Sequence, residues 1–221
     1  MNRLTPFILF IIIISVLGCN REIEEDPIDF GFDYQPLEVG NFWIYSVDQI
    51  IYFGENDSEE DSFFYRDSII SFYINEAGEQ VFIIERSKSY DQSNWSPIEN
   101  YTMLIRRNSL IRTIQNQPSV ALVFPPNEGV SWDSNIYLES PEDEFEIKFF
   151  PGSPNMIQID QEEADDLITY RDNRYEVFQK GVGLIEDYEE VLTYCARNDC
   201  LGNQLIDGGT KTHLKITEYG K

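Results

Sequence analysis

Two cysteines near the C-terminus are the residues best placed for chemistry. Cys195 and Cys200 are separated by Ala-Arg-Asn-Asp, a turn-like sequence that lets the two thiols meet across a tight loop. A metal site would need two further soft ligands, and the single histidine, His213, supplies at most one of them. The pair therefore predicts a disulfide, which stabilises so small a loop by about 2 kcal/mol.

The sequence lacks the common catalytic patterns. There is no G-x-S-x-G nucleophile elbow, one histidine cannot build an H-E-x-x-H zinc motif, and no P-loop or dinucleotide fingerprint occurs. His213 lies in a segment where apolar and polar residues alternate, which indicates an exposed strand histidine rather than a catalytic one. We therefore expect no cofactor, no metal site and no enzymatic activity.

Carboxylates are the abundant reactive groups, with 40 Asp and Glu against 16 Lys and Arg. A glycoside hydrolase needs two of them about 5–10 Å apart across a cleft, and the sequence leaves that alternative open. Residues 55–61, Glu-Asn-Asp-Ser-Glu-Glu-Asp, lack the glycine and the ligand spacing of an EF-hand loop, so they favour an exposed loop over a calcium site. The net charge of −24 argues against nucleic-acid binding, because phosphates are repelled.

Three tryptophans offer aromatic surfaces that could bind a partner. Trp43 and Trp132 fall on the apolar side of alternating segments, which predicts core packing. Trp95 lies in the polar segment 89–97 and is the candidate for an exposed partner contact.

The third cysteine, Cys19, follows a three-part export signal. Asn2-Arg3 is positively charged, residues 7–14 are apolar throughout, and Val16-Leu17-Gly18-Cys19 resembles the lipobox of bacterial lipoproteins. The resemblance implies that residues 1–18 are cleaved and that Cys19 carries lipid. An uncleaved membrane anchor is the alternative, but the apolar stretch is short for a span of about 20 residues.

Residues 19–31 form an acidic tether between the predicted lipid and the predicted domain. Two or three acyl chains give stable membrane attachment, whereas one chain holds a protein only marginally. After Cys19 the tether reads Asn-Arg-Glu-Ile-Glu-Glu-Asp and resembles acidic signals that direct lipoproteins of some Gram-negative bacteria to the outer face of the outer membrane. The sequence therefore predicts an outer-membrane lipoprotein, and leaves the periplasmic and the surface-exposed face open.

From residue 42 onward the dominant hydrophobic period is two, which predicts strands. Residues 145–149 alternate apolar and charged side chains, and Leu214 and Ile216 alternate with polar neighbours. Turn residues at 75–78 and 107–109 predict two hairpins, and the proline-containing segments 125–129 and 151–154 predict breaks between strands.

One short helix is the only exception that the pattern suggests. Asp160 and Glu163 could form a capping box ahead of Ala164, Leu167 and Ile168. The alternative is a strand over residues 168–178 with a turn at 171–173. With 221 residues the chain fits one all-β domain over residues 32–221, built as a single strongly twisted antiparallel sheet, a half-barrel or a sandwich.

Two segments resemble a group of small, uncharacterised bacterial lipoproteins. Residues 34–45, Tyr-Gln-Pro-Leu-Glu-Val-Gly-Asn-Phe-Trp-Ile-Tyr, match a P-L-x-x-G-N-x-W-x-Y opening, and residues 181–185, Gly-Val-Gly-Leu-Ile, match a G-V-G-L-V strand and turn. Residues 127–132, with Gly129 and Trp132, resemble their second G-x-x-W segment. The resemblance implies an antiparallel half-barrel and an exported lipoprotein, and it brings no activity.

These features together predict a lipid-anchored cell-envelope protein with a non-catalytic binding or structural role, its partner a protein or a glycan. A carrier of lipid-like molecules in the half-barrel is one alternative, which a large dry concavity would favour. A carboxylate-dependent glycan hydrolase is the other, which two facing acids in a cleft would favour.

Overall fold

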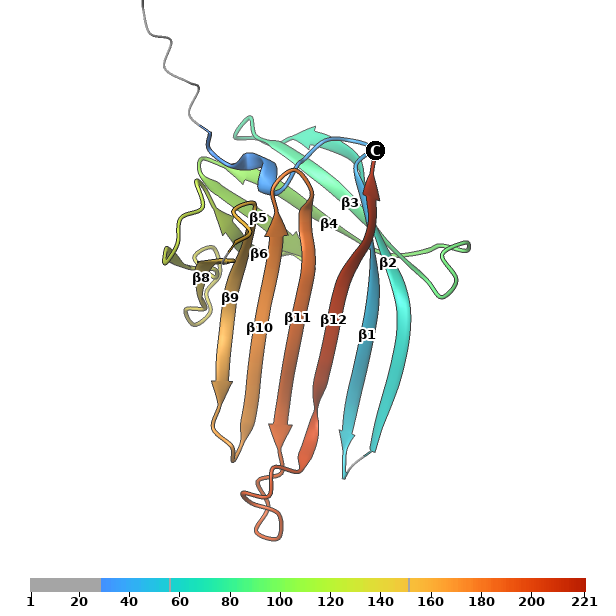
Figure 1. Ribbon diagram of the computed structural model, residues 1–221, viewed down its shortest axis with the longest axis vertical. Helices are drawn as coiled ribbons and strands as arrows, with labels where there is room; N and C mark the ends of the chain where they lie inside the picture. The colour runs from blue at the N-terminus through green and yellow to red at the C-terminus, as the bar shows by residue number, and fades with distance from the viewer. Residues whose placement is uncertain (1–28, 56, 151) are drawn as a thin grey trace, which may run out of the picture.

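A computed structural model describes residues 29–55, 57–150 and 152–221, and Cys19 with the predicted signal and lipobox lies outside this part. The described chain forms one antiparallel sheet of twelve strands in the order β6-β5-β4-β3-β2-β1-β12-β11-β10-β9-β8-β7 (Figure 1). The elements are η1 Phe32–Tyr34, β1 Phe42–Gly54, β2 Asp57–Ile74, β3 Gln80–Ser89, β4 Ser96–Arg106, β5 Ser109–Ile114, β6 Gln117–Val123, β7 Ser131–Asp133, β8 Glu144–Phe149, β9 Met156–Asp165, β10 Tyr170–Gln179, β11 Gly183–Tyr194 and β12 Ile206–Gly220.

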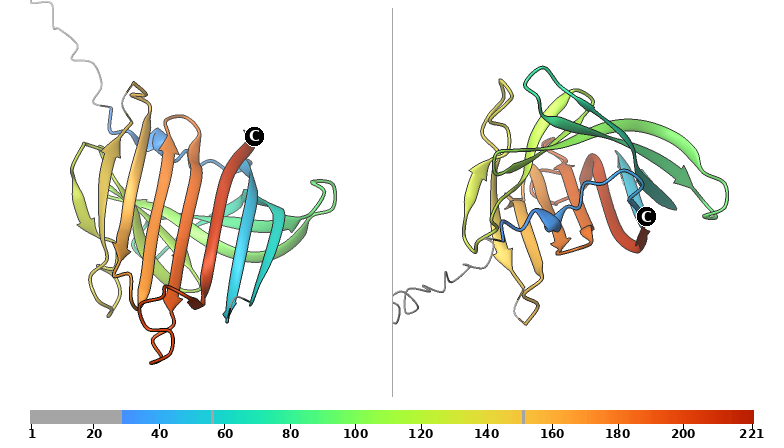
Figure 2. Two further views of the ribbon diagram at one scale, coloured as in Figure 1. Left: turned by 60° about the horizontal axis from the view of Figure 1, so that its bottom comes forward. Right: turned by 90° about the horizontal axis from the view of Figure 1, so that it is seen from above.

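The sheet twists and curls until its two edge strands, β6 and β7, approach each other, which gives a nearly closed barrel (Figure 2). The Trp132 indole N–H donates to the Val120 carbonyl at 2.7 Å, and the Val120 amide donates to the Ser134 carbonyl at 3.0 Å. The predicted fold class, a single twisted antiparallel sheet, is confirmed. Among the described residues, no helix is long and apolar enough to cross a membrane.

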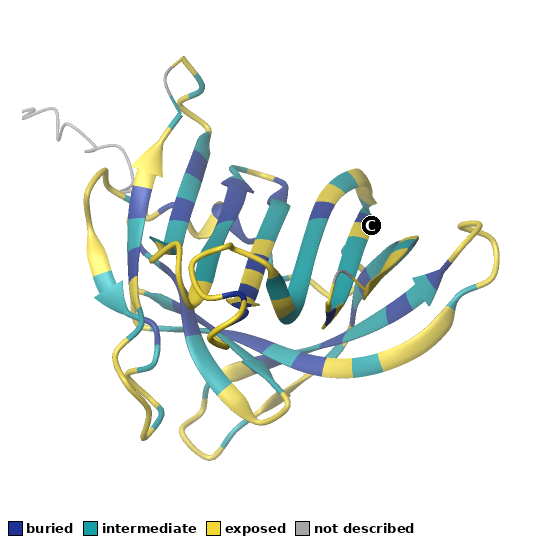
Figure 3. Cartoon of the chain, turned by 90° about the horizontal axis from the view of Figure 1, so that it is seen from below, coloured by how far each residue is buried: buried dark blue, intermediate teal, exposed yellow. Residues whose placement is uncertain are grey.

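Every second side chain along a strand points into the barrel, and together these side chains fill it. Buried positions alternate with half-buried and exposed ones (Figure 3). Trp43 is buried, and its indole N–H donates to the Val182 carbonyl at 2.6 Å. Trp132 is half-buried and packs against Phe145 with ring centroids 6.0 Å apart. Both tryptophans therefore have the packing roles that their position in the pattern predicts. The fully buried side chains include Val47, Ile69, Ile84, Ile147, Ile157, Ile159 and Phe178.

Both predicted hairpins are confirmed. In the β2–β3 turn, the Gly78 amide donates to the Asn75 carbonyl at 3.0 Å, and the Asn75 side chain accepts from the Ala77 and Glu79 amides. The β4–β5 turn lies at residues 107–108, as predicted. In both cases turn-forming residue types were enough to place the connection.

The predicted helix beginning near Asp160 is wrong. Strand β9 runs through this segment, and the ladder between β9 and β10 shifts register between Arg174 and Tyr175, which leaves Gln161 unpaired in a bulge. A bulge moves later side chains to the other face, so the alternation changes phase and imitates a helical spacing. The alternative, a strand over residues 168–178, corresponds to β10, but the turn predicted within it at 171–173 is wrong, because these residues pair with β9 and β11.

The acidic segment 55–61 is not the loop that its composition suggests. Strand β2 begins at Asp57, so only residues 55–56 separate it from β1. Most of these acidic side chains are exposed, but Asp61 accepts hydrogen bonds from Lys88 at 3.1 Å and from Tyr90 at 3.0 Å. Cross-strand pairing with β1 therefore outweighs the low strand propensity of Asp and Glu.

Candidate functional site

A buried arginine–carboxylate pair lies on the inner face of β2 and β3. The Asp67 side chain is 3% exposed and accepts two hydrogen bonds from Arg86, both at 2.7 Å. The Tyr101 hydroxyl donates to the same carboxylate at 3.0 Å. Burial, and then the charge of Asp67, raises the pKa of Tyr101, which keeps this hydroxyl a hydrogen-bond donor. The second Asp67 oxygen is thus bonded twice, and the charge is fully compensated.

A second group, which we call the interior cluster, consists of Arg112, Glu176 and Asp187. Arg112 on β5 donates to Oε1 of Glu176 on β10 at 2.5 Å, across the barrel. Glu176 is buried, and its Oε2 has no hydrogen-bond partner. Asp187 on β11 is directly opposite Glu176 in the ladder and faces the same interior.

Asp187 is the member of the interior cluster that binds a proton near neutral pH. Burial, and then the negative charge of Glu176, raises the pKa of Asp187 to about 7, although Arg112 opposes the shift. A protonated Asp187 is a hydrogen-bond donor on the strand next to the unpartnered Glu176 oxygen. The cluster can therefore hold or release a proton near neutral pH.

A cavity of about 340 Å³ gives the interior cluster an opening to solvent beside the β5–β6 turn. Arg112 forms part of its wall, so one member of the cluster is accessible from outside. The other lining residues are polar or apolar and uncharged: Ile114, Gln115, Gln117, Pro118, Ser119, Asn135 and Leu138.

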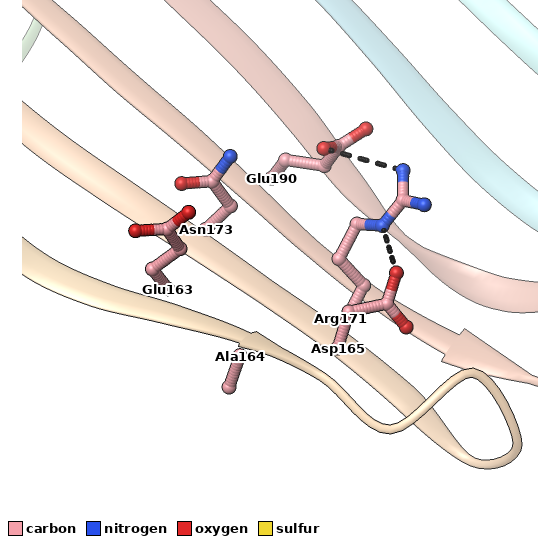
Figure 4. A pocket seen from close by; sticks show the side chains of 6 residues that line it. All are labelled: Glu163, Ala164, Asp165, Arg171, Asn173 and Glu190. Atoms are coloured by element: carbon pink, nitrogen blue, oxygen red, sulfur yellow. Dashed lines mark hydrogen bonds and ion pairs between the residues drawn. The ribbon is translucent and has the colours of Figure 1, made fainter.

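The outer face of β9 to β11 carries a different arrangement, which we call the outer groove (Figure 4). It has a volume of about 320 Å³ and is lined by Glu163, Ala164, Asp165, Arg171, Asn173 and Glu190. Arg171 lies between two carboxylates, with Nε donating to Asp165 at 2.9 Å and Nη1 3.6 Å from Glu190. The groove therefore offers ionic and amide groups that solvent partly reaches, with Glu190 the buried member.

His213 lies beside this groove on the outer face of β12. Its Nε2 is 2.7 Å from Glu186, and its ring meets the Tyr188 ring edge-on at 5.2 Å. Tyr188 in turn stacks on Tyr175 with centroids 5.2 Å apart. The predicted exposed histidine is thus half-buried by its neighbours. Within the part of the chain that the structure describes, no group of three His, Cys, Asp or Glu side chains could hold a metal ion.

Three turns meet at the barrel end that lies opposite the C-terminus and the start of the described chain at Asp29, and we call them the distal turns (Figure 1). They connect β1 to β2, β9 to β10 and β11 to β12. The Tyr194 amide donates to the Thr169 carbonyl at 2.8 Å, which ties the last two turns together. Arg197 lies 3.8 Å from Glu55 and 3.3 Å from Asp207, which ties the first to the third. The distal turns therefore form one connected surface.

The distal turns expose apolar side chains. Phe53, Leu201 and Leu167 are 59%, 55% and 52% exposed, and Ile168, Tyr170 and Leu205 accompany them. Leu167 also has a φ of 61°, a left-handed conformation that a leucine rarely adopts. Asp166 enforces it by accepting hydrogen bonds from the Thr169 hydroxyl and from the amides of residues 168–170, which lowers the pKa of Asp166 far below its usual value. Strain and exposed apolar surface at one place are typical of a recognition site.

The structure describes three of the four site residues predicted from the sequence. Cys195 and Cys200 are joined by a disulfide, with Cα atoms 5.8 Å apart, in the β11–β12 turn. Trp95 lies before β4, is half-buried, and donates its indole N–H to the Gln92 carbonyl at 3.1 Å. Trp95 is therefore less exposed than its polar surroundings suggest. Cys19 lies outside the described residues.

Comparison with known proteins gives a likeness at the level of structure alone. No family model and no curated protein matches the chain. Two solved structures resemble it. One is a candidate exported protein with a YmcC-like fold from Bacteroides fragilis, with 7% identity and a TM-score of 0.43. The other is a candidate lipoprotein from Parabacteroides distasonis, with 9% identity and a TM-score of 0.39. Each comparison covers 88% of this chain and all of the other.

The sequence pattern predicted neither the interior cluster nor the outer groove. Arg112 alternates with Leu110 and Ile114, and Glu176 precedes the core residue Phe178 by two positions. A charged residue on the same side of a strand as apolar core residues was the feature that could have predicted a buried charge. It could not reveal which distant strand supplies the opposite charge, because one sequence does not show how β5 faces β10.

Proposed function

We propose that this protein is a lipid-anchored, non-catalytic binding protein of the cell envelope that contacts a partner protein through the distal turns. The observation that carries the proposal is that three turns, joined by a hydrogen bond and an ion pair, hold exposed apolar side chains at the end opposite to Asp29, where the described chain begins. A protein tethered at one end presents its other end to the surroundings. Apolar anchors on a rigid frame are what protein interfaces use at their centres.

The filled interior supports surface recognition over transport of a lipid-like molecule. Side chains such as Ile147, Ile157 and Ile159 are fully buried inside the barrel. Asp67 and Glu176 lie there too, each paired with an arginine. An acyl chain in the same place would have to separate these buried ion pairs, which is strongly unfavourable.

Lipid attachment is the first part of the proposal to test. Replacing Cys19 with Ala should leave the precursor unlipidated, so that it no longer incorporates radioactive palmitate or partitions into detergent after membrane extraction. Protease treatment of intact cells then assigns the protein to the periplasmic or the surface face. Continued fatty-acid labelling of Cys19→Ala would contradict the predicted lipid anchor.

Partner contact is the second part. A photoreactive amino acid at position 201 in the native cell should give one dominant cross-linked protein. With the photoreactive amino acid kept at position 201, Phe53→Ser combined with Leu167→Asn should abolish the cross-link, because asparagine tolerates the backbone of Leu167 while the apolar contact is lost. Ile98→Ser is the matched control, since Ile98 is 48% exposed but lies on β4.

Trp95→Ala belongs in the same series as the contact predicted from the sequence. A cross-link that survives the distal substitutions but disappears with Trp95→Ala would move the proposed contact to the β3–β4 turn. If the cross-link forms in ordinary cells but is lost in cells that lack surface glycans, the partner is a glycan.

A glycan hydrolase is the second candidate, and the interior cluster is the observation that favours it. Acid-assisted glycoside cleavage requires a protonated and an ionised carboxyl group, and Asp187, with its raised pKa, could supply the proton beside Glu176. Glu176 is buried and bonded to Arg112, which argues against access by a sugar. We therefore expect no turnover on polysaccharide, ester or peptide panels; turnover that Glu176→Gln abolishes would replace the binding proposal.

A further inference from the structure

We infer that the barrel end carrying the N-terminal segment rests on the lipid surface of the membrane that holds Cys19, through Phe30 and Phe32. This inference rests on the lipid anchor of the proposed function, and adds to it a contact and an orientation.

Two phenylalanine rings project from the end of the barrel where the described chain begins. Phe30 is 48% exposed and Phe32 is 39% exposed, and the two rings stack with centroids 5.6 Å apart. Phe32 also meets the buried ring of Phe124 edge-on at 5.0 Å, so one side of the pair is fixed to the core. The remaining ring surface faces outward.

The segment that carries these rings is pinned to the barrel. The Gly181 amide donates to the Asp33 carbonyl at 2.8 Å, and the Lys180 ammonium pairs with Asp29. Gly31 has a φ of 74°, and a Cβ there would lie 2.9 Å from a side-chain carbon of Pro126. Glycine is therefore required for the close approach. Figure 2 shows this segment running across the end of the barrel that also carries the C-terminus.

The length of chain before the pinned segment decides what can cover the rings. Ten residue steps separate Cys19 from Asp29, and an extended chain of that length spans at most about 35 Å. The anchored lipid therefore keeps Phe30 and Phe32 within that distance of the headgroups at all times. Such confinement raises the effective concentration of the lipid surface at the rings far above that of any freely diffusing partner.

The composition of this end suits a membrane interface. Aromatic rings bury their apolar surface at the level of the headgroups, and lysine side chains reach the phosphates beside them. Lys180 and the C-terminal Lys221 lie at this end, but each is paired with a carboxylate, Asp29 and Glu38, so the contact rests on the two rings and not on positive charge. Two rings give a weak, reversible contact, and the covalent lipid makes it persistent.

The test uses the full lipidated protein in supported bilayers of phosphatidylethanolamine and phosphatidylglycerol at about 7:3, with neutron reflectometry as the readout. For the wild type we expect protein density that begins at the headgroups, with no water layer between. Phe30→Ser with Phe32→Ser should open a water layer whose thickness lies between zero and the tether limit of about 35 Å.

Matched variants keep the outcome interpretable. Phe30→Ser alone leaves the packing of Phe32 on Phe124 intact and should give a smaller gap, whereas Phe30→Trp should retain contact. Ile98→Ser removes an equally exposed apolar side chain from β4, outside both proposed surfaces, and should leave the wild-type profile unchanged. Equal profiles for the wild type and the double variant would overturn the inference.

Two further readouts distinguish membrane contact from a missing lipid and from self-association. Mass spectrometry of each variant reports lipidation of Cys19, so an unmodified cysteine counts against the proposed function and not against the membrane contact. Sedimentation in detergent reports self-association, and a wild-type dimer lost in Phe30→Ser would assign these rings to a second copy of the chain and overturn the membrane contact.

Discussion

Strands β10 and β11 carry arginine–carboxylate contacts on both of their faces, and the two faces differ in what those contacts do. On the inner face, the Arg112 and Glu176 side chains are 15% and 3% exposed. On the outer face, Arg171 and Asp165 are 36% and 25% exposed. The same pair of charges is structural where the carboxylate is shielded from water, because losing the arginine leaves a buried charge without a partner. Where water is present, solvent replaces the partner and the side chains remain available for a ligand.

Breaking the buried pair of Asp67 and Arg86 should lower the free energy of unfolding the most. Arg86→Met removes both guanidinium hydrogen bonds and leaves a carboxylate inside the barrel, so we expect a loss of about 3–5 kcal/mol in the free energy of unfolding. Urea denaturation at pH 7 measures it. A loss below about 1 kcal/mol would mean that solvent reaches Asp67 and that the contrast between the faces fails.

Asp187 makes the inner face sensitive to pH. Its pKa is 3.8 when unperturbed and about 7 in the folded protein. Between these values the folded state binds a proton that the unfolded state has released, so stability falls as the pH rises from about 4 to about 7 and levels off above. The contribution is at most about 4 kcal/mol.

Asp187→Asn should remove this slope and raise the stability at pH 8 relative to the wild type. Thermal unfolding from pH 4 to pH 8 checks both statements. Asp165→Asn on the outer face is the matched control, because the pKa of Asp165 is lowered: burial acts to raise it, but the Leu167 amide and Arg171 together outweigh burial. An unchanged slope in Asp187→Asn would contradict the role of the interior cluster.

The disulfide gives a smaller effect, confined to the distal turns. Replacing Cys195 and Cys200 with Ser should lower the free energy of unfolding by about 2 kcal/mol, because the closed loop is short. In the protein isolated from cells without reductant, both thiols should resist alkylation until a reductant is added. Full labelling without reductant would show that the bridge is absent in the cell.

Arg171 on the outer face should give the smallest effect. Arg171→Ala removes an exposed ion pair, so we expect a loss of at most about 1 kcal/mol. A loss comparable to that of Arg86→Met would show that the two faces are energetically alike and that the outer groove is structural rather than available for binding.

Sequence reasoning reached the architecture more easily than the sites. Alternation and turn residues are local, so the strands around Phe145 and the hairpin at Asn75 could be predicted from short segments. A bulge after Asp160 was enough to turn a strand into a predicted helix. The interior cluster joins β5, β10 and β11, and the distal surface joins three turns, so both depend on contacts between residues far apart in the sequence.

The pairing of β1 with β12 determines the order in which the barrel can assemble. Strands β1 to β6 and β7 to β12 each form a chain of consecutive hairpins, whereas β1 pairs with β12, for example Val47 with Leu214. Local hairpins form early, and a contact between opposite ends of a chain carries the largest loop-closure entropy. As the chain is synthesised β1 emerges first, and its pairing edge stays vacant until β12 arrives. That edge must therefore be kept from pairing with other strands until synthesis is complete.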